Sequence, residues 1–282
     1  MKSFALHSQK TQSHLLRTLV YGAAILTAAI ICGLVVYILY KGVPHLSLNL
    51  FNLHYTSENV SLFPALINTL TITFITLLIA VPVGIGAAIY LAEYSHRGSR
   101  IVKIIRITTE TLAGIPSIVY GLFGFLFFVT ALGWGYSMLA GCCTLAILIL
   151  PVIIRTTEEA LLAVSDTYRE ASFGLGAGKL RTVFKVVLPS AMPGILAGIV
   201  LGTGRIVGET AALIYTAGTV AQIPSNVMGS GRTLAVHLYA LWCEGLNTGQ
   251  SYATAVVLLG IVLLLNGLSS VLEKAVIHKV VS

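Results

Sequence analysis

The chain has 282 residues, of which 56% are hydrophobic and only 10% are charged, whereas a typical soluble domain carries about 25% charged residues. This composition excludes a soluble globular protein and predicts an all-α integral membrane protein. The net charge of +7 would suggest nucleic-acid binding in a soluble protein, but here it follows membrane topology. The four cysteines have no CxxC spacing and the seven histidines are scattered, so we expect neither a disulfide framework nor a metal site.

Uncharged runs predict six transmembrane helices, with ends defined to roughly 2–4 residues. They cover residues 18–40, 64–91, 112–131, 137–154, 191–218 and 251–272. The first run exceeds a signal-peptide core and no small-x-small cleavage site follows it, so we expect an uncleaved helix. The uncharged run 111–154 is too long for one span, and GWGYS at 133–137 supplies its turn. The chain therefore divides into an N-terminal part (1–63), with the first helix and an external loop, and a five-helix core domain (64–282).

The basic residues are distributed unequally between the two sides of this topology. Fourteen of the seventeen lie on segments that share a side with the N-terminus, two lie on the other side, and Arg205 lies within a span. An excess of Lys and Arg marks the cytoplasmic side of a membrane protein. Both termini are therefore predicted to be cytoplasmic, with residues 41–59 and 219–250 as external loops.

The most polar stretch, REASFGLGAGKLRTVFKVVLP at residues 169–189, precedes the fifth predicted span. Three glycines stand before Lys179, but a Walker loop would need a glycine in place of Phe173 and a hydroxyl in place of Leu180. The dinucleotide pattern G-x-G-x-x-G also fails. Residues 158–172 have helix-forming composition with acidic residues in the first turn, and the glycines then end that helix. The pattern predicts a polar helix–turn–helix on the cytoplasmic face and no nucleotide site.

This loop resembles the EAA loop of ABC-importer permeases, whose pattern is E-A-A, three residues, G, nine residues and I-x-L-P. The matching positions are Glu170, Ala171, Ser172, Gly176, Val186, Leu188 and Pro189. Ser172 replaces the second alanine and Val186 the isoleucine, while every spacing fits. The resemblance implies that the loop docks on a separate ATPase subunit and is driven by its ATP hydrolysis. The chain would then be a transport subunit without enzymatic activity or cofactor of its own, and the ATPase would bind ATP and magnesium.

Further stretches resemble the PstA-type permeases of phosphate-specific transport systems. They are NTLTITFITLLIAVPVGIGAAIYLAEYS at 68–95, ETLAGIPSIVYGLFG at 110–124 and GRIVGETAALIYTAG at 204–218. The likeness covers most of residues 64–272 and implies the type I ABC-importer architecture in the inner (cytoplasmic) membrane of a cell. It also implies three kinds of partner: a second homologous permease in a heterodimer, two ATPase subunits and an external phosphate-binding protein.

Arg205 and Glu209 are the candidate substrate residues, because ionisable residues inside a span are costly and by default functional. In a continuous helix over 191–218 they would share one face with Gly198 and Gly202, away from lipid. Arginine presents a planar fork that matches phosphate oxygens. A carboxylate accepts a hydrogen bond from protonated phosphate, whereas sulfate carries no such proton. The alternative is an i,i+4 salt bridge that only holds the bundle together.

The predicted function is the permease subunit of an ATP-driven importer of inorganic phosphate. The nearest alternative is the same machine for another oxyanion, such as phosphonate, sulfate or molybdate. A membrane-embedded enzyme acting on lipid phosphate would need clustered catalytic acids or histidines, and none of the ten acids pairs with a histidine inside a predicted span. A sensory membrane protein is a third alternative.

Overall fold

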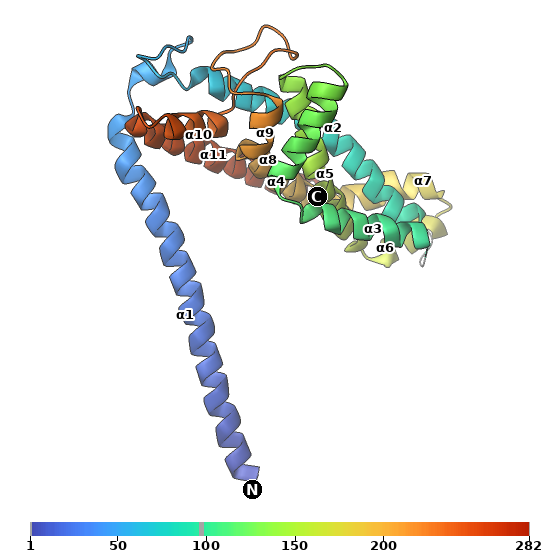
Figure 1. Cartoon of the computed structure of the whole chain (residues 1–282). Helices are drawn as coiled ribbons and strands as arrows, with labels where there is room; N and C mark the ends of the chain where they lie inside the picture. Colours follow the sequence, from blue (N-terminus) through green and yellow to red (C-terminus); the bar gives the residue numbers. More distant parts are fainter. Residues whose placement is uncertain (1, 96–98, 282) are drawn as a thin grey trace.

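The computed structural model describes the backbone of residues 2–95 and 99–281, and their side chains apart from 2–15, 101, 269, 270 and 272–281 (Figure 1). All regular structure in this part is helical, as the composition predicts. The α-helices are α1 (Lys2–Gly42), α2 (Phe63–Ile89), α3 (Arg100–Ala113), α4 (Ser117–Gly124), α5 (Met138–Leu162), α6 (Asp166–Gly174), α7 (Lys179–Thr182), α8 (Leu188–Val207), α9 (Ala211–Thr216), α10 (Leu234–Glu244) and α11 (Thr248–Val281). Short 3-10 segments lie at Val43–His45 and Leu48–Phe51, and π-helical turns at Tyr90–Tyr94, Phe125–Ala131 and Val183–Val187.

Five helical segments of the described chain are long and apolar enough to cross a bilayer. They are Leu16–His45, Phe63–Tyr94, Met138–Leu162, Lys179–Val207 and Thr248–Leu268. A sixth crossing comes from α3 and α4 with its π-turn, a pair that bends by 102°. The prediction of an all-α membrane protein with six spans is confirmed, with this bent pair counted as one broken span.

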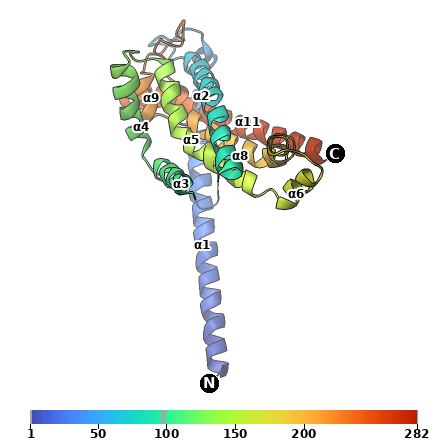
Figure 2. The ribbon, with the colours of Figure 1, turned by 90° about the vertical axis from the view of Figure 1, so that its right-hand side faces the viewer.

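Helix α5 lies at the centre of the bundle, packed against α2, α4 and α8 (Figures 1 and 2). Its side chains Ile149 and Ile153 have no accessible surface. Glycines let the neighbouring helices approach closely. A Cβ atom on Gly84 of α2 would lie 2.6 Å from Cγ2 of Ile153, and one on Gly198 of α8 would collide with Thr156. Because lipid tails are as apolar as the core, such close packing is a main force between spans.

Helix α1 extends away from the bundle and meets α11 near its own C-terminal end (Figure 1). The rings of Tyr37 and Tyr252 meet edge-on there, with 5.9 Å between their centroids. Most apolar side chains between Leu16 and Tyr40 are exposed in this single chain. The first helix therefore contributes little to the core.

The chain bends at Gly114–Pro116, where the sequence predicts a helix that starts at residue 112 and continues to 131. Pro116 has no N–H to donate, and it disfavours helical backbone at the residue before it. Residues 100–113 form the separate helix α3, where the sequence predicts a cytoplasmic loop because Arg100, Lys103 and Arg106 interrupt the apolar positions. The third crossing element is thus a short helix joined to an amphipathic one.

Two other predicted boundaries also differ from the structure. Residues 158–172 are not one helix, because α5 continues to Leu162 and α6 starts after Ser165, whose hydroxyl accepts a hydrogen bond from the Thr167 N–H. The predicted external loop 219–250 contains helix α10, which is shorter than a membrane span.

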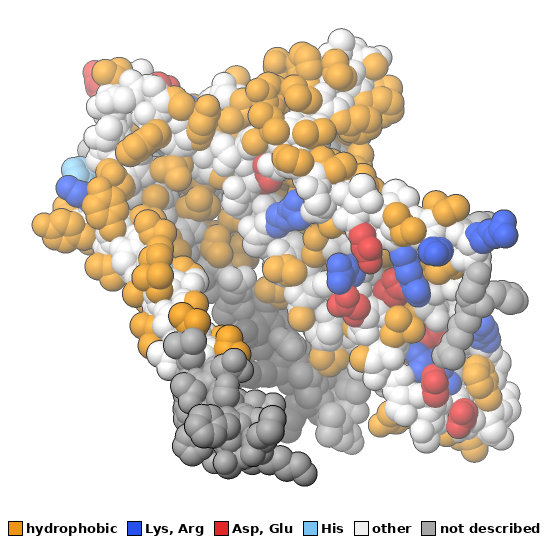
Figure 3. Space-filling model, turned by 60° about the horizontal axis from the view of Figure 1, so that its bottom comes forward, with side chains coloured by type: hydrophobic (Ala, Val, Ile, Leu, Met, Phe, Trp, Pro, Cys, Tyr) orange, Lys and Arg blue, Asp and Glu red, His pale blue; other side chains and the backbone are white. Residues whose placement is uncertain are grey.

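Charged side chains gather at the end of the molecule that α3, α6 and α7 form (Figure 3). Helix α2 connects this end to the other: its first turns lie beside the 219–233 loop, and Glu93, in the π-turn that follows it, bonds to Arg169 of α6. We call the charged end the α6 end.

Candidate functional site

The predicted coupling loop folds as a short hairpin of α6 and α7. Glu170 and Ala171 are exposed on α6, whereas Ser172 is buried and its hydroxyl hydrogen-bonds to the hydroxyl of Thr182, with 2.8 Å between the oxygens. Gly176 has a φ of +81°, which lies in the left-handed region where residues other than glycine are strained. The glycine of the EAA pattern therefore makes the turn, and the serine that replaces the second alanine adds a bond that closes the hairpin.

The last two positions of the pattern join this hairpin to the membrane helix. Pro189 stands in the first turn of α8, where its missing N–H costs little. Leu188 packs against a buried cluster that includes Leu161 and Val187. On the outside of the hairpin several large apolar side chains are exposed, and Leu175 is 89% exposed. The others are Tyr168, Phe173, Leu180 and Phe184. Several large exposed apolar side chains on one short segment are typical of a protein–protein contact.

One arginine fastens α6 to the ends of two spans. Nη2 and Nε of Arg169 donate to Oε1 of Glu93, in the π-turn after α2, at 2.6 and 3.1 Å. The same guanidinium donates to the carbonyl oxygens of Leu161 (2.9 Å) and Val164 (2.6 Å) after α5, and to Asp166 of α6 (3.2 Å). The side chains of Arg169 and Glu93 are largely buried. Sequence reasoning missed this link because 76 positions separate the two residues.

Arg205 lies in the last turn of α8 and is half-buried. It makes no hydrogen bond or ion pair with any side chain or backbone group in the described part of the chain. Its charge acts on the hydroxyl of Tyr120 in α4, and this hydroxyl donates to the carbonyl oxygen of Leu112 at 2.8 Å across the α3–α4 bend. Among the described residues Arg205 is therefore a cation inside a predicted span with no ion-pair partner. An unpaired cation in this position can attract an anion.

Glu209 does not continue the helix of Arg205, so the prediction of one helix over 191–218 with both residues on one face is wrong. Residues 208–210 separate α8 from α9. Oε1 of Glu209 accepts a hydrogen bond from the N–H of Ala212 at 3.2 Å, and the carboxylate thereby caps α9. The ion pairs of the described residues do not include one between Glu209 and Arg205. The i,i+4 salt bridge is therefore not formed here, while the transport roles of both residues stay predictions.

The part of the chain that carries these residues also matches a known family. Residues 80–278 match the family described as binding-protein-dependent transport system inner membrane component. The chain belongs to this family. The match contains the α6–α7 hairpin, Arg169, Arg205 and Glu209.

Relatives of this transport component include named permeases. The chain is 37% identical to the probable ABC transporter permease protein YqgI of Bacillus subtilis, over 79% of this chain and 81% of that protein. It is 38% identical to the phosphate transport system permease protein PstA of Pasteurella multocida, over 77% of this chain and 78% of that protein. The resemblance to PstA-type permeases seen in the sequence is confirmed by these matches.

Solved structures show the same fold. An inward-facing form of the MetNI methionine ABC transporter matches with a TM-score of 0.64 and 22% identity, over 76% of this chain and 95% of that chain. A bacterial ABC transporter involved in the import of the acidic polysaccharide alginate matches with a TM-score of 0.58 and 17% identity, over 87% and 95%. This transport component is thus a multi-pass membrane protein with the fold of ABC-importer permeases, as predicted.

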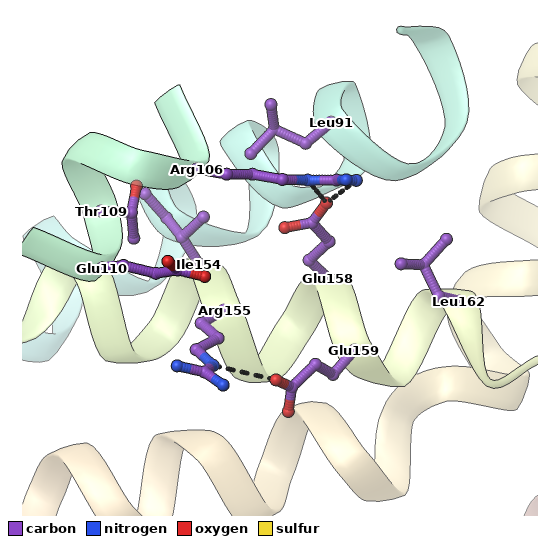
Figure 4. A pocket seen from close by; sticks show the side chains of 9 residues that line it. All are labelled: Leu91, Arg106, Thr109, Glu110, Ile154, Arg155, Glu158, Glu159 and Leu162. Atoms are coloured by element: carbon purple, nitrogen blue, oxygen red, sulfur yellow. Dashed lines mark hydrogen bonds and ion pairs between the residues drawn. The ribbon is translucent and has the colours of Figure 1, made fainter. Parts of the chain in front are cut away.

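A small charged pocket of about 170 Å³ lies between α3 and α5 at the α6 end (Figure 4). Arg106 of α3 donates to Oε1 of Glu158 through Nε at 2.9 Å and Nη2 at 2.5 Å, which fastens α3 to α5. Arg155 donates to Glu159 at 2.9 Å, but both side chains of this pair are more than half exposed, so it contributes little to stability. With Glu110, three acids face two arginines, and the pocket does not suit an anion.

At the opposite end of α2, several buried polar atoms have no hydrogen-bond partner among the described residues. They are Nε and Nη2 of Arg232, both ring nitrogens of His237 and Oδ1 of Asn68. Cζ of Arg232 lies 4.8 Å from the centroid of the Tyr55 ring, and the same ring meets the His237 ring edge-on at 6.0 Å. Nδ2 of Asn68 donates to the carbonyl oxygen of Arg232 at 3.1 Å. We call Asn68, Arg232 and His237 the Arg232 cluster.

The Arg232 cluster is costly as it stands. Burial of a charge without a hydrogen-bonded partner costs several kcal/mol, and a buried cation–π contact such as that with Tyr55 offsets about 2 kcal/mol or somewhat more of this cost. The sequence predicts an external loop over 219–250, yet the side chains of Arg232 and His237 in it are almost completely buried. The only signal in the sequence is that this arginine stands alone after the uncharged run 210–231.

Acidification is expected to destabilise the protein through His237. Burial and, secondarily, the charge of Arg232 lower the pKa of His237 from 6.5 to about 3, and the third group at this ring, Tyr55, is uncharged. Between these values the unfolded chain binds a proton that the folded chain does not. The free energy of unfolding therefore falls as pH falls, by up to about 1.4 kcal/mol per pH unit.

The measurement is the thermal midpoint of the nanodisc-embedded chain between pH 7.5 and 5, followed by tryptophan fluorescence. The His237→Gln variant keeps a polar side chain without a titrating ring, and its midpoint should depend less on pH. Equal pH slopes for the two proteins would contradict this prediction.

Proposed function

We propose that the chain is the permease subunit of an ATP-driven importer of inorganic phosphate and forms half of its translocation pathway. The main support for an anionic substrate is Arg205. Its guanidinium is half-buried within a spanning helix and has no ion-pair partner in the described structure. Phosphate is the favoured anion because the relative in Pasteurella multocida is named a phosphate transport system permease. The match to that protein covers the segment with Arg205.

In this proposal Arg205 contacts phosphate as it passes and Glu209 favours phosphate over sulfate. Only Oε1 of Glu209 accepts a hydrogen bond in the described structure, so Oε2 can accept one from a protonated phosphate oxygen. The two residues act from the two sides of the α8–α9 break and not from one helix face. Glu209 is then a selectivity group that caps α9 and does not hold Arg205.

The α6–α7 hairpin is the proposed docking site for an ATPase subunit, which binds ATP and magnesium in place of this chain. The proposed ATPase-coupling residues are Glu170, Ala171, Ser172, Gly176, Leu188 and Pro189. The exposed apolar side chains of the hairpin supply the contact surface, and Arg169 passes its movement to α2 and α5. The complete importer would contain a second homologous permease in a heterodimer, two ATPase subunits and an external phosphate-binding protein.

The proposed orientation in the inner membrane has the α6 end and both termini in the cytoplasm. The unequal distribution of Lys and Arg supports it. The loops at the start of α2, with Tyr55 and Arg232, then face the outside.

The test is uptake of labelled phosphate by phosphate-starved cells with and without this chain, in a strain with no second phosphate importer. Loss of uptake on deletion, restored by the intact chain and unaffected by excess phosphonate or sulfate, is the expected result. Inhibition by one of these competitors would assign the importer to that oxyanion. Unchanged uptake on deletion would refute phosphate transport.

A further inference from the structure

The Arg232 cluster combines groups from three separate parts of the chain. Asn68 comes from α2, Arg232 from the end of the 219–233 loop and His237 from the first turns of α10. The backbone of Arg232 is held on both sides: its N–H donates to the carbonyl oxygen of Val220 at 2.9 Å, and its carbonyl oxygen accepts from Asn68. Folding thus places Nε and Nη2 of this guanidinium where no described residue accepts a hydrogen bond from them. Buried polar atoms without partners are rare in proteins, so several together indicate a ligand absent from the described state.

The side chain of Tyr55 lies over two members of the cluster. Tyr55 is only partly buried, and its ring lies over the guanidinium of Arg232 and against His237. The unpartnered atoms have almost no accessible surface, so a ligand can reach them only when a covering group moves. Tyr55 is the partly buried side chain in contact with both Arg232 and His237.

The loop that carries Tyr55 is built as a compact unit. Oδ1 of Asn59 accepts from the N–H groups of Thr56 and Ser61 at 2.9 and 3.0 Å, and Nδ2 of Asn59 donates to the carbonyl oxygen of His54 at 2.8 Å. Val60 has a φ of +46°, which is strained for a β-branched residue. Strain held in this way is common beside functional sites, and this loop positions Tyr55 as a cover.

We propose that the Arg232 cluster is a second anion site, that its ligand is inorganic phosphate, and that Tyr55 is its movable cover. The identity of the ligand rests on the proposed function, whereas the anion site rests on the unpartnered guanidinium. In the proposed orientation the site stands at the outer entrance, and phosphate meets it before Arg205.

The chemistry of the cluster fits a protonated oxyanion. Nε and Nη2 of Arg232 are the adjacent donors that bind two oxygens of one phosphate. His237 is neutral at physiological pH, so one ring nitrogen donates and the other accepts. The accepting nitrogen of His237 and Oδ1 of Asn68 each need a donor. The two hydroxyls of dihydrogen phosphate supply both donors, whereas sulfate supplies none. A single ligand can thereby satisfy atoms that the protein leaves unpaired.

The test measures binding of labelled inorganic phosphate to the intact chain in nanodiscs, in an Arg205→Gln background that removes the other proposed site. Tyr55→Ala should open the cover and raise the affinity for phosphate at least tenfold, while Tyr55→Phe keeps the ring and should bind as the native residue does. Adding Arg232→Gln to Tyr55→Ala should lower the affinity at least tenfold, and Arg232→Lys should lower it less. Excess sulfate should compete at least tenfold less well than phosphate.

A second measurement separates loss of the site from misfolding. Phosphate should raise the thermal midpoint of the Tyr55→Ala chain and leave that of the Tyr55→Ala, Arg232→Gln chain unchanged. Equal phosphate binding with and without Arg232, in chains that unfold at similar temperatures, would overturn the proposal, as would equal competition by sulfate.

The outcome is distinguishable from failure of the proposed function. Phosphate uptake by cells that is intact alongside binding independent of Arg232 would refute only the second site. Binding that depends on Arg232 in a chain whose deletion leaves uptake unchanged would refute only the importer.

Discussion

Replacing Arg205 with glutamine is expected to lower phosphate uptake at least a hundredfold, and replacing it with lysine about tenfold. Hydrogen bonds to charged groups are worth about 1.5–3 kcal/mol each, and 1.4 kcal/mol corresponds to a factor of ten. Glutamine removes the charge and the fork, whereas lysine keeps a charge but cannot bind two phosphate oxygens in parallel. Arg205 has no partner in the described structure, so these changes break no internal ion pair. The measurement is initial uptake of labelled phosphate at equal amounts of membrane-inserted protein.

Arg155 offers a matched control for this prediction. It is also an arginine on a spanning helix, but its side chain is 61% exposed and pairs only with Glu159. Arg155→Gln should leave uptake within about twofold of the unmodified chain, since exposed pairs contribute about 0–1 kcal/mol. Normal uptake by the Arg205→Lys variant would refute contact between Arg205 and the substrate.

Replacing Arg169 with glutamine is expected to uncouple ATP hydrolysis from transport. The change leaves the carboxylate of Glu93 buried and unpaired and removes the bonds to the carbonyl oxygens of Leu161 and Val164. Removal of one partner from a buried pair costs about 3–5 kcal/mol. The change therefore weakens the attachment of α6 to the ends of α2 and α5. Uptake should decrease at least tenfold while the purified importer with its ATPase still hydrolyses ATP.

Two further variants separate coupling from general damage. Glu93→Gln keeps an acceptor for Arg169 without the charge and should impair uptake less than Arg169→Gln. Arg106→Gln removes the bond between α3 and α5, which lies outside the α6 junction, and should leave the ratio of phosphate taken up to ATP hydrolysed unchanged. If Arg169→Gln lowers uptake and ATP hydrolysis in the same proportion, the residue does not transmit the movement of α6.

The number and type of spans were predictable because they depend on hydropathy and charge along the chain. A helix that crosses a bilayer needs about 20 consecutive apolar residues, and such a run can be recognised directly in the sequence. The turn at Gly176 could also be predicted from neighbouring residues, since its backbone conformation favours glycine. The helix breaks were harder to predict. The sequence Gly208-Glu209-Thr210 has nothing that forbids a helix, and the break becomes favourable because Glu209 caps α9 and α9 packs against α4.

The amino-acid sequence by itself determined the membrane class, the six apolar segments, the coupling-loop pattern and the presence of Arg205 within a span, because each is a property of neighbouring residues. Only the tertiary structure decided which charges are paired and which are left alone. Glu93 and Arg169 meet because the π-turn after α2 lies beside the first turn of α6, and Arg232 is buried because the 219–233 loop folds over α2 beneath Tyr55. Burial and pairing arise between segments distant in sequence, and no local pattern contains them.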